Sequence, residues 1–299
     1  ANKVETLMEA MPYLQKYQGK IIVIKYGGNA MINEELKDAV MHDVVLLKLL
    51  GMKPVLSHGG GPGINKMLEK LDIPVEFIEG LRYTSADIMR VVEMVLVGQV
   101  NTELVGFINK LGGKAVGLSG VSGDIYHCHQ RDEVHGYVGD IDYVDPKPIF
   151  AMLDAGYIPV IAPVGTDGQG HTFNINGDTA AGKLASALGA EKLVILTDIE
   201  GLCNDIKIRD VISYLNIEDV KALKDKGTIA GGMIPKVNCC VECVRQGVDE
   251  RQHHRRPQAA LRALRGIHER GHWHDDRHRT AERRHQMVKH TPNFYYRRT

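Results

Sequence analysis

The sequence predicts an α/β protein, a three-layer αβα sandwich in two lobes with a mainly parallel central sheet. Short apolar segments rich in β-branched residues alternate with longer helical segments, which is typical of a parallel sheet covered on both faces. Two of the predicted strands run directly into glycine-rich turns. The length of 299 residues is enough for two lobes with a substantial core.

The predicted elements follow one another in a regular order. Residues 4–17 have apolar side chains at helical spacing around Pro12, so we expect a kinked helix that packs on another subunit or on its own lobe. Residues 123–145 are polar and predict a hairpin. The expected strands are KIIVIKYGG (20–28), KPVLSHGGG (53–61), KAVGLSG (114–120), YIPVIAPVG (157–165) and KLVILTDIEG (192–201). The expected helices span 34–51, 64–71, 86–110, 147–155 and 178–189.

Bulk composition argues against several classes of protein. The formal net charge is zero, so charge alone gives no attraction to nucleic acid or to a membrane surface. We expect no membrane span, because no apolar run approaches about 18 residues, and no signal peptide. Five cysteines, three of them at 239–243, indicate reduced thiols in the cytoplasm rather than a disulfide framework or a metal site.

The two glycine-rich turns are candidate anion sites. Lys25 precedes the first turn and His58 precedes the second. Glycines at the ends of parallel strands let the backbone approach a ligand and present N–H groups to it. Neither turn has the spacing of a Walker A loop or of a dinucleotide fingerprint, which argues against P-loop enzymes and Rossmann dehydrogenases.

The second half of the chain adds a polar loop and a lysine at a turn. A polar loop with Asn174, Asn176 and Asp178 leads into a helix. Its alternative interpretation is helix capping, which Asp178 or Thr179 could provide alone. Lys236 follows GGMIP, and its alternative interpretation is a solvated surface lysine.

Six motifs in order give this chain a clear resemblance to the amino-acid kinase family over residues 4–248. They are IKYGGNAM, SHGGGPGINKMLEKL, GLRYTSAD, NINGDTAAGKLA, LTDIEGL and GGMIPKV. GLRYT together with NINGD favours the members that act on N-acetyl-L-glutamate over those that act on carbamate, aspartate, glutamate or uridylate.

The resemblance implies ATP-dependent phosphorylation, with Mg²⁺, of the side-chain carboxylate of N-acetyl-L-glutamate, on the route to arginine or ornithine. A carboxylate is already a nucleophile, so no general base is needed and His58 is expected to be structural. Catalysis should be mostly positioning and electrostatic stabilisation of two anions.

The resemblance also assigns residues to roles. The catalytic set consists of Lys25, Lys236 and Asp178, with the carboxylate holding both lysines. The substrate-binding set consists of Gly60, Gly61, Arg82 and Asn174, where Arg82 pairs with the α-carboxylate and Asn174 holds the acetamido or carboxylate group. The phosphate- and nucleotide-binding set consists of Gly28, Thr197, Asp198, Gly201 and Leu202. No metal-binding side chain is expected.

Other interpretations stay open at this point. The chain could be a glutamate 5-kinase or carbamate kinase type of the family, or a non-catalytic amino-acid-binding regulator. Residues 4–17 resemble the extra helix of arginine-inhibited members, so the expected assembly is a homodimer, or a homohexamer formed through that helix, with arginine as an inhibitor.

The resemblance stops near Val248. We divide the chain into the helix at 1–18, a substrate-binding and dimerisation lobe at 19–165, a truncated ATP lobe at 166–248 and an Arg/His-rich tail at 249–299. That tail holds 12 of the 17 arginines and 8 of the 14 histidines. Without the family's last strands, we expect buried sheet edges to be left unpaired.

A shift of reading frame explains the tail better than metal or nucleic-acid binding. Codons for Gly271–Arg277, read one base later, permit GIGTMI, and those for Glu250–His268 permit SDNIIDGRKPHSALFEGFT. Both are family-like segments at the expected distance. In the same shifted frame, the codons for Met287 and Val288 can give only tryptophan, and the codon after it is permitted to be a stop.

Overall fold

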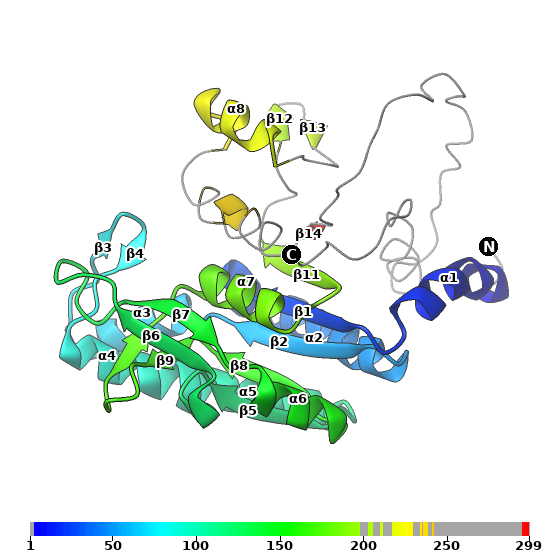
Figure 1. Ribbon diagram of the computed structural model, residues 1–299, viewed down its shortest axis with the longest axis horizontal. Helices are drawn as coiled ribbons and strands as arrows, with labels where there is room; N and C mark the ends of the chain where they lie inside the picture. The colour runs from blue at the N-terminus through cyan, green and yellow to red at the C-terminus, as the bar shows by residue number, and fades with distance from the viewer. Residues whose placement is uncertain are drawn as a thin grey trace.

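A parallel sheet forms the centre of the protein. The computed structural model describes residues 3–197, 203–205, 210–211 and 217–229, positions 234, 236–238 and 241, and residues 295–298. Every pairing in the six-stranded sheet is parallel (Figure 1). Across the sheet its strands are β14 (Tyr295–Arg298), β11 (Lys192–Thr197), β1 (Ile21–Tyr26), β2 (Lys53–His58), β8 (Ile158–Ala162) and β5 (Ala115–Ser119).

Side chains of the central strands are buried on both faces of the sheet. Ile24 and Leu56 belong to one core cluster, while the adjacent Val23 and Val55 belong to the other. Because successive strand residues point to opposite faces, each strand contributes to both cores. This is why these strands read as continuous apolar runs, and it confirms the three-layer arrangement.

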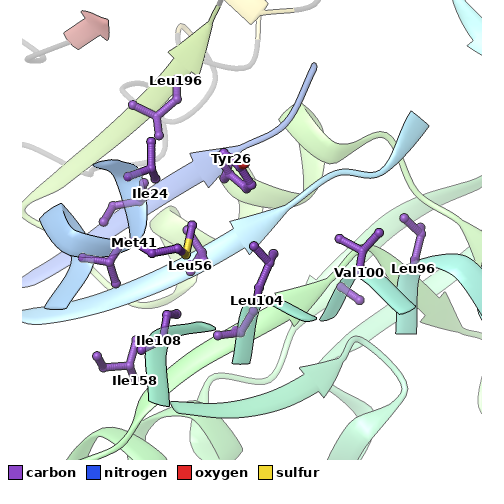
Figure 2. Packing of buried hydrophobic residues seen from close by; sticks show 14 of the residues in the cluster. Ile24, Tyr26, Met41, Leu56, Leu96, Val100, Leu104, Ile108, Ile158 and Leu196 are labelled. Atoms are coloured by element: carbon purple, nitrogen blue, oxygen red, sulfur yellow. The ribbon is translucent and has the colours of Figure 1, made fainter. Parts of the chain in front are cut away.

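One face of the sheet is covered by the helices that precede the hairpin. Figure 2 shows Met41 and Leu104 near Leu56 of β2, with Leu96 and Ile108 in the same core cluster. The helical elements on this face are α2 (Glu34–Leu49), α3 (Gly61–Lys70), α4 (Ala86–Glu93), the π-helical segment η2 (Met94–Asn101) and α5 (Thr102–Lys110).

The opposite face is covered by two helices and a second sheet. The helices are α6 (Lys147–Asp154) and α7 (Gly177–Ala187). The second sheet has the order β10 (Thr172–Asn174), β9 (Val164–Thr166), β6 (Tyr126–Gln130) and β7 (Gly139–Val144). Its antiparallel β6–β7 pair confirms the predicted hairpin.

The predicted strand at 157–165 is two strands that lie in different sheets. β8 ends at Ala162, and β9 begins at Val164. Pro163 lies between them, and because proline has no N–H to donate, a ladder is easily interrupted there. The prediction of one continuous strand was therefore wrong.

The predicted helix at 86–110 is helical throughout but not uniformly α-helical. Met94–Asn101 is a π-helix between α4 and α5. By length and composition, this 25-residue stretch is the one helix in the described residues that could span a membrane. Its buried side chains, such as Val92 and Ile108, instead belong to the core over the sheet.

The remaining elements lie around this body. Helix α1 (Lys3–Tyr17) contains Pro12, and Figure 1 shows it at the end of the molecule away from the β3–β4 hairpin. The other described elements are β3 (Phe77–Ile78), β4 (Leu81–Arg82), the 3₁₀ turns η1 (Gly28–Met31) and η3 (Ser122–Asp124), β12 (Cys203–Asp205), β13 (Asp210–Val211) and α8 (Asp219–Asp225).

The outer edge of β11 is paired. Residues of β14 align in parallel with β11, with Tyr295 opposite Val194 and Arg298 opposite Thr197. We expected buried sheet edges to be left unpaired, and at the outer edge of β11 this was wrong, because a strand from the tail occupies it. Residues 242–294 lie outside the described part of the chain.

Candidate functional site

Asp178 joins two lysines that are far apart in the sequence. Its Oδ1 lies 2.8 Å from Nζ of Lys25, and its Oδ2 lies 3.0 Å from Nζ of Lys236. Burial opposes ionisation of this carboxyl, but the two ammonium groups outweigh it and hold the pKa of Asp178 below its usual range. The predicted catalytic trio is therefore assembled, with an ionised carboxylate between two cations.

Helix α7 presents Asp178 without using it as a cap. The N-cap is Asn176, whose side-chain oxygen accepts from the backbone N–H groups of Asp178 at 3.0 Å and Thr179 at 3.1 Å. The alternative in which Asp178 or Thr179 caps the helix is wrong, because Asn176 already satisfies these donors. The Asp178 carboxylate is thus left to the lysines. Lys236 is likewise not a solvated lysine, because it is paired with this carboxylate.

Glycines let the turns after β1 and β2 meet the start of α7. The Gly59 N–H donates to the Tyr26 carbonyl at 2.7 Å. A β-carbon on Gly59 would lie 3.7 Å from Cα of Gly27, and one on Gly177 would lie 3.7 Å from Cα of Gly59. The three backbone segments are therefore in direct contact at the carboxyl edge of the sheet, beside Lys25.

The glycines predicted to bind ligand differ in their surroundings. Gly28 has φ +69° and open space where a β-carbon would lie, so its backbone conformation, rather than crowding, favours glycine. A β-carbon on Gly60 would lie 2.3 Å from Cδ2 of Leu96, whereas one on Gly61 would meet nothing within 4 Å. Gly61 opens α3, where the first backbone N–H groups have no partner inside the helix.

Arg82 is a buried cation, and one of its two terminal guanidinium nitrogens is unpaired among the described residues. It is 8% exposed, its Nη2 donates to Asn65 Oδ1 at 2.5 Å, and its guanidinium lies 4.9 Å from the Phe77 ring centroid. Its Nη1 has no hydrogen-bond partner among the described residues. Burial lowers the pKa of Arg82 from its very high usual value. A buried guanidinium with free donors suits an anionic ligand.

Asn174 is connected to Arg82 through Thr84. Nδ2 of Asn174 lies 3.1 Å from Oγ1 of Thr84, and this hydroxyl donates to the Arg82 carbonyl at 2.9 Å. The structure thus places the Asn174 side chain of β10 beside Thr84, two residues after Arg82 of β4.

His58 is enclosed and neutral. It is fully buried, its Nδ1 donates to the Gly59 carbonyl at 2.7 Å, and its Nε2 accepts from Nδ2 of Asn101 at 3.1 Å. Burial lowers the pKa of His58 from 6.5 to about 4. Asn101 also donates to the Val160 carbonyl at 2.9 Å. This network fits the expected structural role and anchors the second glycine turn to the sheet.

The predicted nucleotide residues are only partly described. Thr197 is the last residue of β11. Asp198, Gly201 and Leu202 lie outside the described residues, as do the cysteines at 239, 240 and 243.

Asn65, Thr84 and Asn101 support the site but were not predicted. Asn65 and Thr84 lie within the motifs SHGGGPGINKMLEKL and GLRYTSAD, but the motifs alone do not show which contacts these side chains make. Asn176 could have been identified from its position immediately before a helix.

Comparisons with known proteins place these features in a family. Residues 20–251 match the amino acid kinase family. Acetylglutamate kinase from Heliobacterium modesticaldum is 51% identical over 261 residues, covering 83% of this chain and 88% of its own. The chloroplastic acetylglutamate kinase of Arabidopsis thaliana is 49% identical over 249 residues, covering 82% and 72% respectively. The crystal structure of smu.665 from Streptococcus mutans superposes with a TM-score of 0.69 at 32% identity, covering 76% and 91%.

Proposed function

Because this chain belongs to the amino acid kinase family, we propose that the site around Asp178 transfers the γ-phosphoryl group of ATP to a carboxylate. The acceptor is the side-chain carboxylate of N-acetyl-L-glutamate, and the product is the acyl phosphate of arginine biosynthesis. About half of all aligned residues are identical to those of acetylglutamate kinases over more than four-fifths of the chain, and this similarity supports the substrate most strongly.

Lys25 and Lys236 stabilise the transferring phosphoryl group. An anionic nucleophile must approach an anionic phosphoryl group, so charge is the main obstacle to the reaction. Two ammonium groups fixed by one carboxylate place positive charge there without reorganisation during the reaction. No general base is required, because the nucleophile is already ionised.

Arg82 and Asn174 bind the amino-acid part of the substrate. The unpaired Nη1 of Arg82 supports a pairing with the α-carboxylate. Gly60 and Gly61 offer backbone N–H groups to the reacting carboxylate or the phosphoryl group, as expected at the start of a helix.

Gly28, Thr197, Asp198, Gly201 and Leu202 contact the nucleotide. We propose that Mg²⁺ enters with ATP and is held mainly by its phosphates.

The site belongs to two lobes, residues 19–165 and 166–248, and the protein works in the cytoplasm.

We further propose that α1 links dimers into a hexamer and that arginine inhibits this form. Met8 and Met11 of α1 are 61% and 43% exposed, which leaves apolar surface for another subunit. Sedimentation of a variant lacking residues 1–18 tests this assembly, and an unchanged oligomer would contradict it.

The tail at 249–299 arises from a frameshift. The family match ends at residue 251, which supports this proposal. The nucleotide sequence across codons 245–290, together with the intact mass of the protein, tests it. An unbroken frame and a matching mass would favour a genuine basic tail instead.

A hydroxamate assay tests the activity itself. Hydroxylamine traps an acyl phosphate, so the full-length chain with ATP, Mg²⁺ and N-acetyl-L-glutamate should yield product. L-Glutamate and carbamate as acceptors test the related kinase types. A folded protein that binds N-acetyl-L-glutamate but yields no product would favour a non-catalytic regulator.

A further inference from the structure

Thr84 lies between the two residues that we assign to the substrate. It is fully buried. Its hydroxyl lies 2.9 Å from the Arg82 carbonyl oxygen and 3.1 Å from Nδ2 of Asn174. A single hydroxyl group therefore connects the Asn174 side chain to the backbone carbonyl of Arg82. Thr84 belongs to the GLRYTSAD motif, but the sequence assigned it no role.

The proton on this hydroxyl has one possible destination. The carbonyl oxygen of Arg82 can only accept a hydrogen bond, so the Thr84 hydroxyl must donate its single proton to that oxygen. Towards Asn174 the hydroxyl can then act only as an acceptor. The NH₂ group of the Asn174 amide must therefore face Thr84, and its Oδ1 must point elsewhere. No hydrogen bond is donated to that oxygen within the described part of the chain.

Backbone bonds keep the pair in register. Thr84 N–H donates to the His135 carbonyl at 3.1 Å, and Tyr137 N–H donates to the Thr84 carbonyl at 2.7 Å. Asn174 N–H donates to the Tyr137 carbonyl at 2.9 Å. The backbone of Tyr137 is thus hydrogen-bonded to both Thr84 and Asn174. These bonds keep the side-chain amide of Asn174 next to the Thr84 hydroxyl.

We propose that Thr84 is a positioning residue that fixes Asn174 Oδ1 as the acceptor for the amide N–H of N-acetyl-L-glutamate. This inference rests on the proposed function and deepens it. Both carboxylates of the substrate are ionised at neutral pH and carry only acceptors, so the acetamido N–H is its one donor. Asn174 Oδ1 facing a carboxylate would be repelled. Arg82, with its unpaired Nη1, takes the α-carboxylate.

An ester analogue of the substrate tests this assignment. In 2-acetoxyglutarate an oxygen replaces the N–H, so Oδ1 would face another acceptor. Isothermal titration of the full-length chain should give a dissociation constant at least about tenfold higher for the ester than for N-acetyl-L-glutamate. Binding is measured without ATP, so the result does not depend on phosphoryl transfer.

Variants of Thr84 separate positioning from general structure. Thr84→Val preserves the shape and removes the hydroxyl, so the Asn174 amide can turn and the ratio of ester to amide dissociation constants should fall towards one. Thr84→Ser should restore the wild-type ratio. Thr166→Val removes another buried hydroxyl, which accepts from Gly168 N–H at 3.1 Å, and should leave the ratio unchanged.

The outcomes are distinguishable. Equal binding of ester and amide by the wild type would overturn the inference, as would an unchanged ratio in a folded Thr84→Val protein. Thr84→Ala removes the same hydroxyl and leaves a smaller side chain. If the valine variant does not fold, the ratio of ester to amide dissociation constants is measured on Thr84→Ala instead. If N-acetyl-L-glutamate does not bind the wild type at all, the proposed function fails. Binding with an unaltered ratio contradicts the inference alone.

Discussion

Lys25 Nζ and Asp178 Oδ1 lie 2.8 Å apart and are both nearly inaccessible to solvent, with side chains 8% and 11% exposed. The contact connects the end of β1 to the first turn of α7. A buried ion pair of this kind is costly to break on one side, because the remaining charge stays buried without compensation. The conformation of each side chain therefore depends on the presence of the other.

Asp178→Asn should disable phosphoryl transfer while preserving substrate binding. The amide has the size of the carboxylate but lacks its charge. Its single acceptor oxygen can hold at most one lysine, while its NH₂ group would face the other ammonium. We expect kcat to fall by about 100-fold or more, the scale of losing a preorganised electrostatic contact. The KM for N-acetyl-L-glutamate should change by only a small factor. Steady-state hydroxamate kinetics measure both.

Asp154→Asn is the matched control for that variant. Asp154 pairs with Lys53 at 3.0 Å on the surface and is 71% exposed, so its loss should be close to neutral. A kcat for Asp178→Asn as high as that of this control would contradict the proposed electrostatic role.

Arg82→Lys should weaken substrate binding more than catalysis. Lysine keeps the charge but lacks the planar guanidinium, in which Nη2 donates to Asn65 while Nη1 is available for the substrate. We expect the KM for N-acetyl-L-glutamate to rise by about tenfold or more, with the KM for ATP unchanged. Arg131→Lys alters an exposed pair with Asp140 and should behave like the wild type. A parallel rise in both KM values would argue for general misfolding.

Gly60→Ala should destabilise the second glycine turn. Its β-carbon would lie 2.3 Å from Leu96 Cδ2, inside the packed core over the sheet. Overpacking of this kind costs about 1–3 kcal/mol of unfolding free energy. Gly61→Ala, next to it in the chain, has open space around its β-carbon and should cost much less. Urea unfolding of the two proteins provides the comparison, and equal stability would refute this packing.

His58 should make stability depend on pH in the acidic range. Its folded pKa of about 4 lies below the ordinary 6.5, so between these values the unfolded chain binds the extra proton. Stability is then complete above pH 6.5 and is lost as the pH falls towards 4, by roughly 3 kcal/mol in total. His58→Asn should have a flatter profile than the wild type in urea unfolding across this range. Parallel profiles would show that His58 does not contribute.

Much of the fold was predictable because burial on both faces leaves a strong apolar pattern in β1, β2 and β11. Boundaries were less predictable. Pro163 divides a continuous apolar run between two sheets, and π-helical hydrogen bonding at Met94–Asn101 leaves no periodic signature.

The resemblance to the family led us to expect Lys25, Lys236 and Asp178 at one site, and the structure places the two lysines beside the carboxylate. The roles assigned to them and to Arg82 stay predictions. Residues that orient those side chains were not predictable. Thr84 accepts a tertiary hydrogen bond from Asn174, and Asn65 accepts one from Arg82; any polar residue in the sequence could have made such bonds. The helix cap was misassigned because three candidate caps, Asn176, Asp178 and Thr179, lie within four positions.

The ammonium of Lys25 folds back over the glycine two positions later, so that a β-carbon on Gly27 would lie 3.0 Å from its Nζ. An alanine at Gly27 would therefore act chiefly by displacing this ammonium. Once Lys25 is replaced by a shorter side chain, the same alanine has little left to displace. The two positions are consequently epistatic, and a double-mutant cycle between them would be strongly non-additive. The effect of a substitution at either position therefore depends on the residue at the other.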